Sequence, residues 1–138
     1  MGKKQVISLR KRIEIRAGGR CEYCRAPQSA CGYRFHLEHI LPTAEGGSDE
    51  IQNRALACAT CNLAKSDQTT GVDPETGETV ALFDPRTDRW DEHFRWQDGP
   101  PTILGLTPEG RATVLALDMN AELRLDARQL WFDAGLLP

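Results

Sequence analysis

Short hydrophobic patterns organise the first half of the chain. Leu9 and Ile13 stand four residues apart, which predicts a helix over residues 9–17. Alternation of apolar and polar positions predicts a strand over residues 33–40, and a second short strand is expected over residues 54–57. These patterns indicate a mixed α+β region.

Polar, turn-forming stretches separate these elements. Residues 26–33 and 43–53 are predicted loops, and the second contains the pair Gly46-Gly47. After the second strand, a helix is expected to begin at Asn62. The predicted order is therefore helix, strand, loop, strand, helix.

The second half of the chain predicts short strands followed by two helices. Residues 69–79 are rich in turn residues and are expected to connect two parts. Thr107 followed by Pro108 predicts a helix start, and Asn120 is expected to cap a second helix. The strands are predicted over residues 80–83, 93–96 and 102–106, and the apolar stripe of the last helix is Leu123, Ala127, Leu130, Trp131 and Ala134.

We therefore expect two parts, residues 1–68 and residues 69–138, with the second packing on the first. With 40% hydrophobic residues in 138, a single large apolar core is hard to build, and a metal cross-link would compensate. Three aromatic residues of the second part are expected to fill its core rather than stack on bases: Trp90, Phe94 and Trp96.

Charge is distributed unevenly between the two halves. Residues 1–70 carry 11 Lys/Arg and 7 Asp/Glu, whereas residues 71–138 carry 6 and 13. A basic N-terminal half is typical of a polyanion binder, although a solvated charged face is the alternative. Arg12, Arg16 and Arg20 are the candidate phosphate contacts, and the acidic second half suits a protein partner.

The ends and the hydropathy of the chain predict a cytoplasmic protein. Met1 leads into basic residues without an apolar leader, and no apolar run approaches the ~18 residues that a membrane span needs. No membrane partner is expected.

Four cysteines form two Cys-x-x-Cys pairs, Cys21/Cys24 and Cys58/Cys61. This spacing favours a structural zinc site, because each pair presents two thiolates to one tetrahedral ion. Disulfides are the alternative. Zinc alone also fits a module without catalytic activity. Cys31 has no partner at this spacing and is expected to be a bystander.

A polar group lies between the cysteine pairs and carries the candidate chemistry. Histidine imidazoles in general accept a proton near neutral pH, which makes His39 a candidate general base. Glu38 and Asn62 offer oxygen ligands, which favour Mg²⁺ or Mn²⁺ over Zn²⁺. The amide of Asn53 is expected to orient the His39 imidazole.

These residues resemble the HNH endonucleases in type, order and spacing over about residues 20–66. The resemblance implies a zinc-stabilised ββα-metal core, treble-clef-like, within an α+β protein that adds a small C-terminal strand-plus-helix extension. It also implies that His39 activates water, that Asn53 orients it, and that Glu38 and Asn62 hold the catalytic ion. Many members carry a histidine where this chain has Asn62, so soft ions are expected to be less favoured. The substrate implied is DNA.

Several assignments keep alternatives at this stage. Lys65 shares a helix face with Asn62 and either contacts a phosphate or closes the helix. His36 is either a surface residue or an auxiliary group of the site. A non-catalytic nucleic-acid-binding zinc module is the main rival function. The other is a nuclease for RNA or structured DNA that works in a larger complex.

Overall fold

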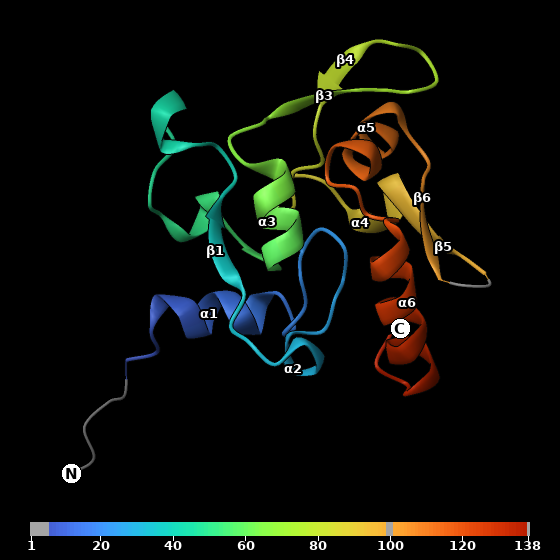
Figure 1. Ribbon diagram of the computed structural model, residues 1–138. Coiled ribbons are helices and arrows are strands. Elements are labelled where there is room, and N and C mark those ends of the chain that lie inside the picture. The colour runs from blue at the N-terminus through green and yellow to red at the C-terminus, as the bar shows by residue number, and fades with distance from the viewer. Residues whose placement is uncertain (1–5, 99–100, 138) are drawn as a thin grey trace.

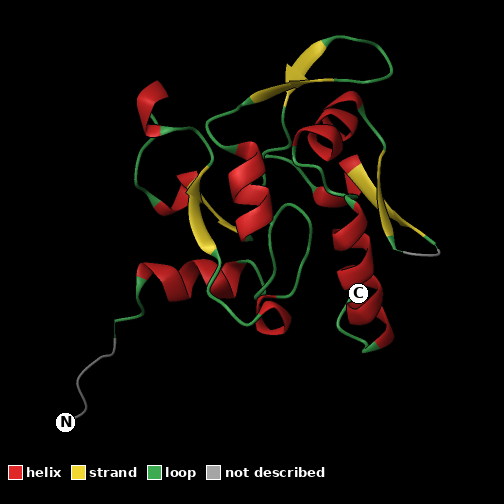
Figure 2. Cartoon of the chain, viewed as in Figure 1, coloured by secondary structure: helices red, strands yellow, loops and turns green. Residues whose placement is uncertain are grey.

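The computed structural model describes residues 6–98 and 101–137 as a mixed α+β fold. Helices and short two-stranded hairpins alternate along the chain (Figure 2). The β1–β2 hairpin, α1 and α3 lie on one side, and α5, α6 and the β5–β6 hairpin lie on the other (Figure 1). In chain order the helices and strands are α1 (Leu9–Arg16), α2 (Gln28–Cys31), β1 (His36–His39), η1 (Thr43–Glu45), η2 (Ile51–Asn53), β2 (Arg54–Ala57), α3 (Ala59–Lys65), β3 (Thr70–Val72), β4 (Thr79–Ala81), α4 (Trp90–His93), β5 (Phe94–Gln97), β6 (Thr102–Gly105), α5 (Pro108–Ala116) and α6 (Glu122–Asp133).

The N-terminal helix forms where the hydrophobic spacing predicts it. The Ser8 hydroxyl accepts a hydrogen bond from the Lys11 backbone N–H, as expected of an N-cap. Ile13 is fully buried against the core, whereas Ile15 on the other face is exposed. α1 therefore packs through one face and leaves Lys11 and Arg12 in solvent.

The β1–β2 hairpin is antiparallel and pairs His39 with Arg54. The helix that follows begins at Ala59, three residues before the predicted start at Asn62. The physical reason is the sulfur of Cys58, which accepts a hydrogen bond from the Cys61 backbone N–H and so caps the helix. As a result Asn62 lies within the first turns of α3.

Three predicted loops contain regular structure. The segment 26–33 holds the one-turn helix α2, and the segment 43–53 holds the 3-10 helices η1 and η2. The expected connector 69–79 supplies β3, which pairs antiparallel with β4. Three-residue strands have too short a pattern to be recognised, so pairing decides this hairpin. It is held to α5 by a buried carboxylate, because Asp73 accepts two hydrogen bonds from the Arg111 guanidinium.

In the C-terminal part, the Thr107 cap is confirmed and the Asn120 cap is wrong. The Thr107 hydroxyl accepts from the Gly110 N–H at the start of α5. The Asn120 amide instead pairs with both backbone groups of Ile103 in β6, and α6 begins after Ala121. The side chain of Asn120 therefore links the loop between α5 and α6 to β6.

The apolar stripe of α6 is only partly buried, contrary to the expected packing. Leu123 and Leu130 are 79% and 69% exposed, whereas Arg128 is buried. The Arg128 guanidinium donates to the carbonyls of Pro101 and Met119, and it lies over the Trp96 ring. These carbonyls stabilise a buried cation, so the helix turns Arg128 inward and its leucines outward.

One hydrophobic core runs through both parts of the chain. Trp90 and Phe94 are buried in it, and Trp96 packs against Trp90, as expected of core-filling residues. Members from the first part include Ile13, Tyr23, Phe35 and Leu56, and members from the second include Phe83, Ile103, Leu117 and Met119. The boundary at residues 68/69 remains a prediction.

Candidate active site and metal centre

The four paired cysteines meet in a buried cluster. Their sulfur atoms all lie within 4.8 Å of one another, and the cluster joins the turn after α1 to the start of α3. All five cysteines of the chain are unbridged, and Cys31 lies outside the cluster. The expectation of a metal site rather than disulfides agrees with this geometry.

The cluster has the dimensions of a tetrahedral zinc site. Four thiolates at ~2.3 Å from one zinc ion lie ~3.8 Å apart, and the Cys24 and Cys58 Sγ atoms are 3.7 Å apart. The residues present therefore fit a structural Zn²⁺ ion.

A cation from the C-terminal helix lies against this cluster. Arg124 of α6 donates to the Cys61 Sγ at 3.0 Å and lies 4.0 Å from the Cys58 Sγ. A zinc ion with four thiolates carries a net charge of −2, so a guanidinium at this distance offsets part of it. The metal cluster and α6 are thus in direct electrostatic contact.

A cavity of about 610 Å³ lies beside the hairpin and α3. Glu38, His39 and Asn62 all line it, so the fold brings Asn62 of α3 to the neighbouring residues Glu38 and His39 of β1. The side-chain amide of Asn62 has no hydrogen-bond partner among the described residues. None of the described residues that line the cavity is Lys or Arg, whereas Glu38 and Asp67 are acidic.

Glu38 is almost fully buried at one wall of this cavity. Its Oε2 accepts a hydrogen bond from the Tyr23 hydroxyl at 2.7 Å, and its Oε1 lies 2.5 Å from Lys65 Nζ. Oε1 nevertheless accepts no hydrogen bond of normal geometry from the described residues. Burial raises the pKa of Glu38, and Lys65 and Tyr23 oppose that rise by stabilising the anion.

His39 has a carboxylate partner that the sequence did not reveal. Its Nε2 lies 2.7 Å from Asp49 Oδ1, and Arg54 Nη2 lies 3.3 Å from the same oxygen. The pKa of Asp49 is lowered, first by the hydrogen bond with His39 and then by the charge of Arg54. An ionised Asp49 only accepts, so Nε2 carries the hydrogen of this bond, and in a neutral imidazole the free lone pair is then on Nδ1.

Residues 21–68, which contain this cavity and both cysteine pairs, match the family described as HNH endonuclease. These residues form an HNH domain. No curated protein and no solved structure matches the chain. The match covers about a third of the chain and ends before β3. Within the described residues, no helix has the length and apolarity required to cross a membrane.

Asn53 of the HNH domain braces the loop beside His39. Its amide donates to the carbonyls of Leu41 and Ser48 and accepts from the Leu41 N–H. The expected contact between this amide and the His39 ring is absent from the hydrogen bonds of the described residues. Gly47 is tight against the Leu41 carbonyl, where an added Cβ would lie 1.8 Å from the oxygen. Asn53 and Gly47 therefore close the loop that brings Asp49 to His39.

The basic residues of the first part take different positions. Arg16 donates to the carbonyls of Ile51 and Arg54, so its guanidinium holds α1 on the hairpin. Arg20 donates to the carbonyl of Leu136 at the far end of the chain. Arg12 is exposed, and its guanidinium has no hydrogen-bond or ion-pair partner among the described residues.

Lys65 is buried within the HNH domain, being only 2% exposed. Its ammonium pairs with Glu38 and donates to the Ile40 carbonyl at 3.2 Å. It is therefore placed as the counter-charge of Glu38, away from the surface where a phosphate would approach. His36 is exposed at the start of β1 and lines the same cavity as His39.

Proposed function

We propose that this protein is a divalent-metal-dependent endonuclease that hydrolyses phosphodiester bonds in DNA. The observation that carries the proposal is His39, which is paired with Asp49 and lines a cavity shared with Glu38 and Asn62. A histidine with one nitrogen on a carboxylate and the other free is arranged as a general base. The family match of residues 21–68 supports the same reaction class.

In this proposal His39 Nδ1 removes a proton from the attacking water. Asp49 stabilises the imidazolium that results, and Arg54 holds Asp49 in place. Asn53 acts at one remove, because it fixes the backbone of the loop that carries Asp49. General-base catalysis of this kind contributes about 10²–10⁴-fold to the rate.

Glu38 and Asn62 are the residues that would hold the catalytic ion, Mg²⁺ or Mn²⁺. Two observations support this: both residues line the cavity, and the Asn62 side-chain amide has no hydrogen-bond partner among the described residues. Lys65 lies beside Glu38, and it balances the charge of the carboxylate. Such an ion supplies Lewis-acid stabilisation of charge on the phosphate and on the leaving oxygen. The acidic lining also favours a cation, since a phosphate entering beside Glu38 would otherwise meet like charge.

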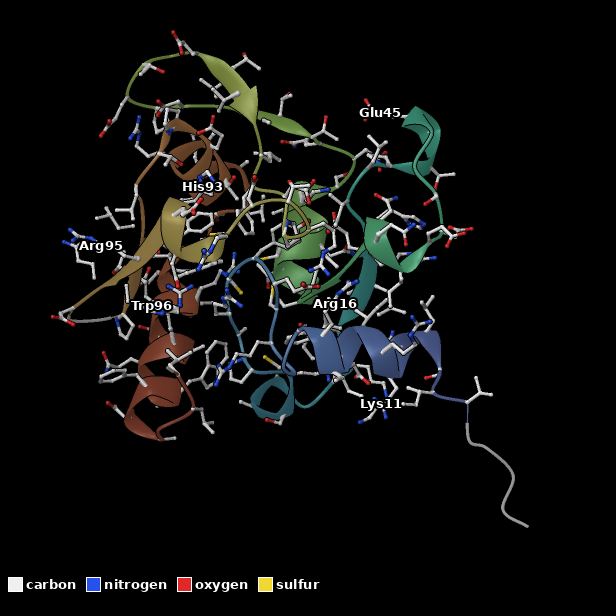
Figure 3. The ribbon with its side chains drawn as sticks, turned by 180° about the vertical axis from the view of Figure 1, so that it is seen from behind. Lys11, Arg16, Glu45, His93, Arg95 and Trp96 are labelled. Carbon is white, nitrogen blue, oxygen red and sulfur yellow. The ribbon has the colours of Figure 1, made fainter. Side chains whose placement is uncertain are left out.

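DNA is proposed as the substrate because exposed cations of α1 lie on the HNH side of the molecule. Lys11 and Arg12 are exposed residues of α1. Figure 3 shows Lys11 on the outer side of this helix and Arg16 on the side toward the hairpin. The thiols that zinc needs fit a reducing compartment, and the cytoplasm is the proposed location. The C-terminal part, with its outward leucines on α6, is where we propose that a protein partner would bind.

The test is nicking of supercoiled plasmid by full-length, zinc-loaded protein. Mg²⁺ or Mn²⁺ should be added or omitted without a chelator, because a chelator would also remove zinc. We expect nicking that requires the added ion, and the same protein should be assayed on a structured RNA. Cleavage of RNA alone would reassign the substrate, and cleavage of neither by folded, zinc-loaded protein would favour a binding module.

A further inference from the structure

Tyr23 is a buried tyrosine that contacts both Glu38 and the C-terminal part of the chain. It stands between Cys21 and Cys24 in the first cysteine pair, and it is 1% exposed. Its hydroxyl donates to Glu38 Oε2 at 2.7 Å.

The C-terminal part holds Tyr23 from the other side. The Trp90 indole N–H donates to the Tyr23 carbonyl at 2.8 Å. The ring of Phe83 meets the Tyr23 ring edge-on, with centroids 6.3 Å apart. Both partners lie in residues 69–138, so continuous contacts run from the C-terminal part through Tyr23 to Glu38.

We propose that Tyr23 is a positioning residue through which the zinc cluster and the C-terminal part orient the Glu38 carboxylate toward the divalent ion. This inference rests on the proposed function, because it takes Glu38 as a ligand of that ion. A glutamate side chain rotates about several bonds, and Lys65 alone leaves it free to turn both oxygens to the ammonium. The Tyr23 hydroxyl holds Oε2 while Lys65 Nζ lies 2.5 Å from Oε1, so the carboxylate is fixed in one orientation at the wall of the cavity.

The hydroxyl serves this purpose separately from the packing of the ring. A phenylalanine would keep the contact with Phe83, and the backbone carbonyl would still accept from Trp90. Only the bond to Glu38 requires the oxygen atom. Tyr23→Phe therefore separates positioning of Glu38 from filling of the core.

The experiment is a Mn²⁺ titration of full-length, zinc-loaded protein, followed by the electron paramagnetic resonance signal of the free ion. We expect Tyr23→Phe to bind Mn²⁺ about 10-fold more weakly, the lower end of the 10–100-fold typical of lost outer-shell partners. Zinc content should stay the same. Any nicking activity lost at low Mn²⁺ should return at high Mn²⁺, which a general loss of structure would not allow.

Tyr33→Phe is the matched control, since Tyr33 is the other tyrosine of the chain. Its hydroxyl accepts from the Ala59 N–H and does not contact Glu38, so Mn²⁺ affinity should stay at the wild-type value. If Tyr23→Phe does not fold, Trp90→Phe replaces it and should weaken Mn²⁺ binding in the same direction by removing the bond to the Tyr23 carbonyl.

Two results would overturn the inference, and they differ in meaning. Wild-type Mn²⁺ affinity in Tyr23→Phe, or in the replacement variant, would reduce Tyr23 to a packing residue while leaving the proposed function standing. Unchanged Mn²⁺ affinity in Glu38→Gln would remove Glu38 from the ion site, and the proposed site would then fail together with the role of Tyr23.

Discussion

At the scale of single residues, the exposed cations of α1 are the side chains best placed to meet a phosphate backbone. Replacing Lys11 and Arg12 together by alanine should weaken DNA binding and flatten its dependence on salt. Each lost phosphate contact lowers the slope of log K against log salt by about 0.9, so two contacts lower it by ~2. Fluorescence anisotropy without divalent ions measures this slope.

The matched control removes the same charge from the other side of the molecule. Arg89 and Arg95 are exposed in the C-terminal part, and Figure 3 shows Arg95 far from Lys11. Their double alanine variant should keep the wild-type slope. Equal slopes for the two double variants would show that α1 does not track the phosphates.

The sequence predicted the grouping of Glu38, His39 and Asn62 because their motif is local to one hairpin and one helix. It did not predict Asp49, since that contact depends on the path of a loop closed by Gly47 and Asn53. Two acidic residues in that loop were the available signal, but alternation and spacing cannot select between them.

The burial of Glu38 could not be predicted from the sequence either. Its neighbours Tyr23 and Lys65 come from a cysteine turn and from the end of α3, and only the folded chain brings them to β1. For Lys65, helix spacing gave the correct face but not its burial. For Arg16 and Arg20, basic character indicated phosphate contacts, whereas the guanidiniums bind carbonyl groups of the protein.

At the scale of elements, the β3–β4 hairpin is held to α5 by the ion pair of Asp73 and Arg111, whose contribution to stability depends on pH. The pKa of Asp73 is lowered, first by its hydrogen bond with Arg111. A lowered pKa adds stability above the unfolded value of about 3.9, and that stability is lost as the pH falls below it. Asp73→Asn should therefore unfold at lower urea than wild type at pH 7.

This difference in urea midpoint should narrow as the pH is taken below about 4, because wild-type Asp73 then loses its advantage. Circular dichroism at each pH measures the midpoints. Asp126→Asn, at an exposed carboxylate of α6, should match wild type throughout. A difference that stays constant down to pH 2 would contradict the ionic role of Asp73.

The elements themselves were predicted where the pattern is long or carries a cap. α1 and α5 follow from apolar spacing and from the Ser8 and Thr107 caps. β3 and α2 are too short for any period to be seen. Asn120 is a residue type that often caps helices, but its side-chain amide makes two hydrogen bonds with the backbone of β6 instead.

At the scale of the whole molecule, zinc is expected to hold both parts of the chain. The first cysteine pair carries the Trp90 contact, and the second lies against Arg124 of α6. Removal of zinc by a strong chelator should therefore disrupt the N-terminal and C-terminal parts together. Zinc binding contributes on the order of 10–16 kcal/mol to the folding of small domains. Losing a contribution of that size is enough to unfold this protein.

Tryptophan fluorescence and near-ultraviolet circular dichroism should change at the same chelator concentration, because Trp90 packs on the first cysteine pair. Cys58→Ser should lose zinc and soluble protein, whereas Cys31→Ser, outside the cluster, should keep both. A zinc-free protein with native spectra would show that the cluster is dispensable for the fold.

The central claim is that His39 is the base of a metal-dependent nuclease, and the plasmid-nicking rate of His39→Ala tests it most directly. The account predicts a loss of at least about 10²-fold, with zinc content and circular dichroism unchanged because His39 lies outside the zinc cluster and the core. Glu92→Ala, an exposed change purified in the same way, should keep the wild-type rate and exclude a contaminating nuclease. Ion-dependent nicking by His39→Ala at the wild-type rate would contradict the account.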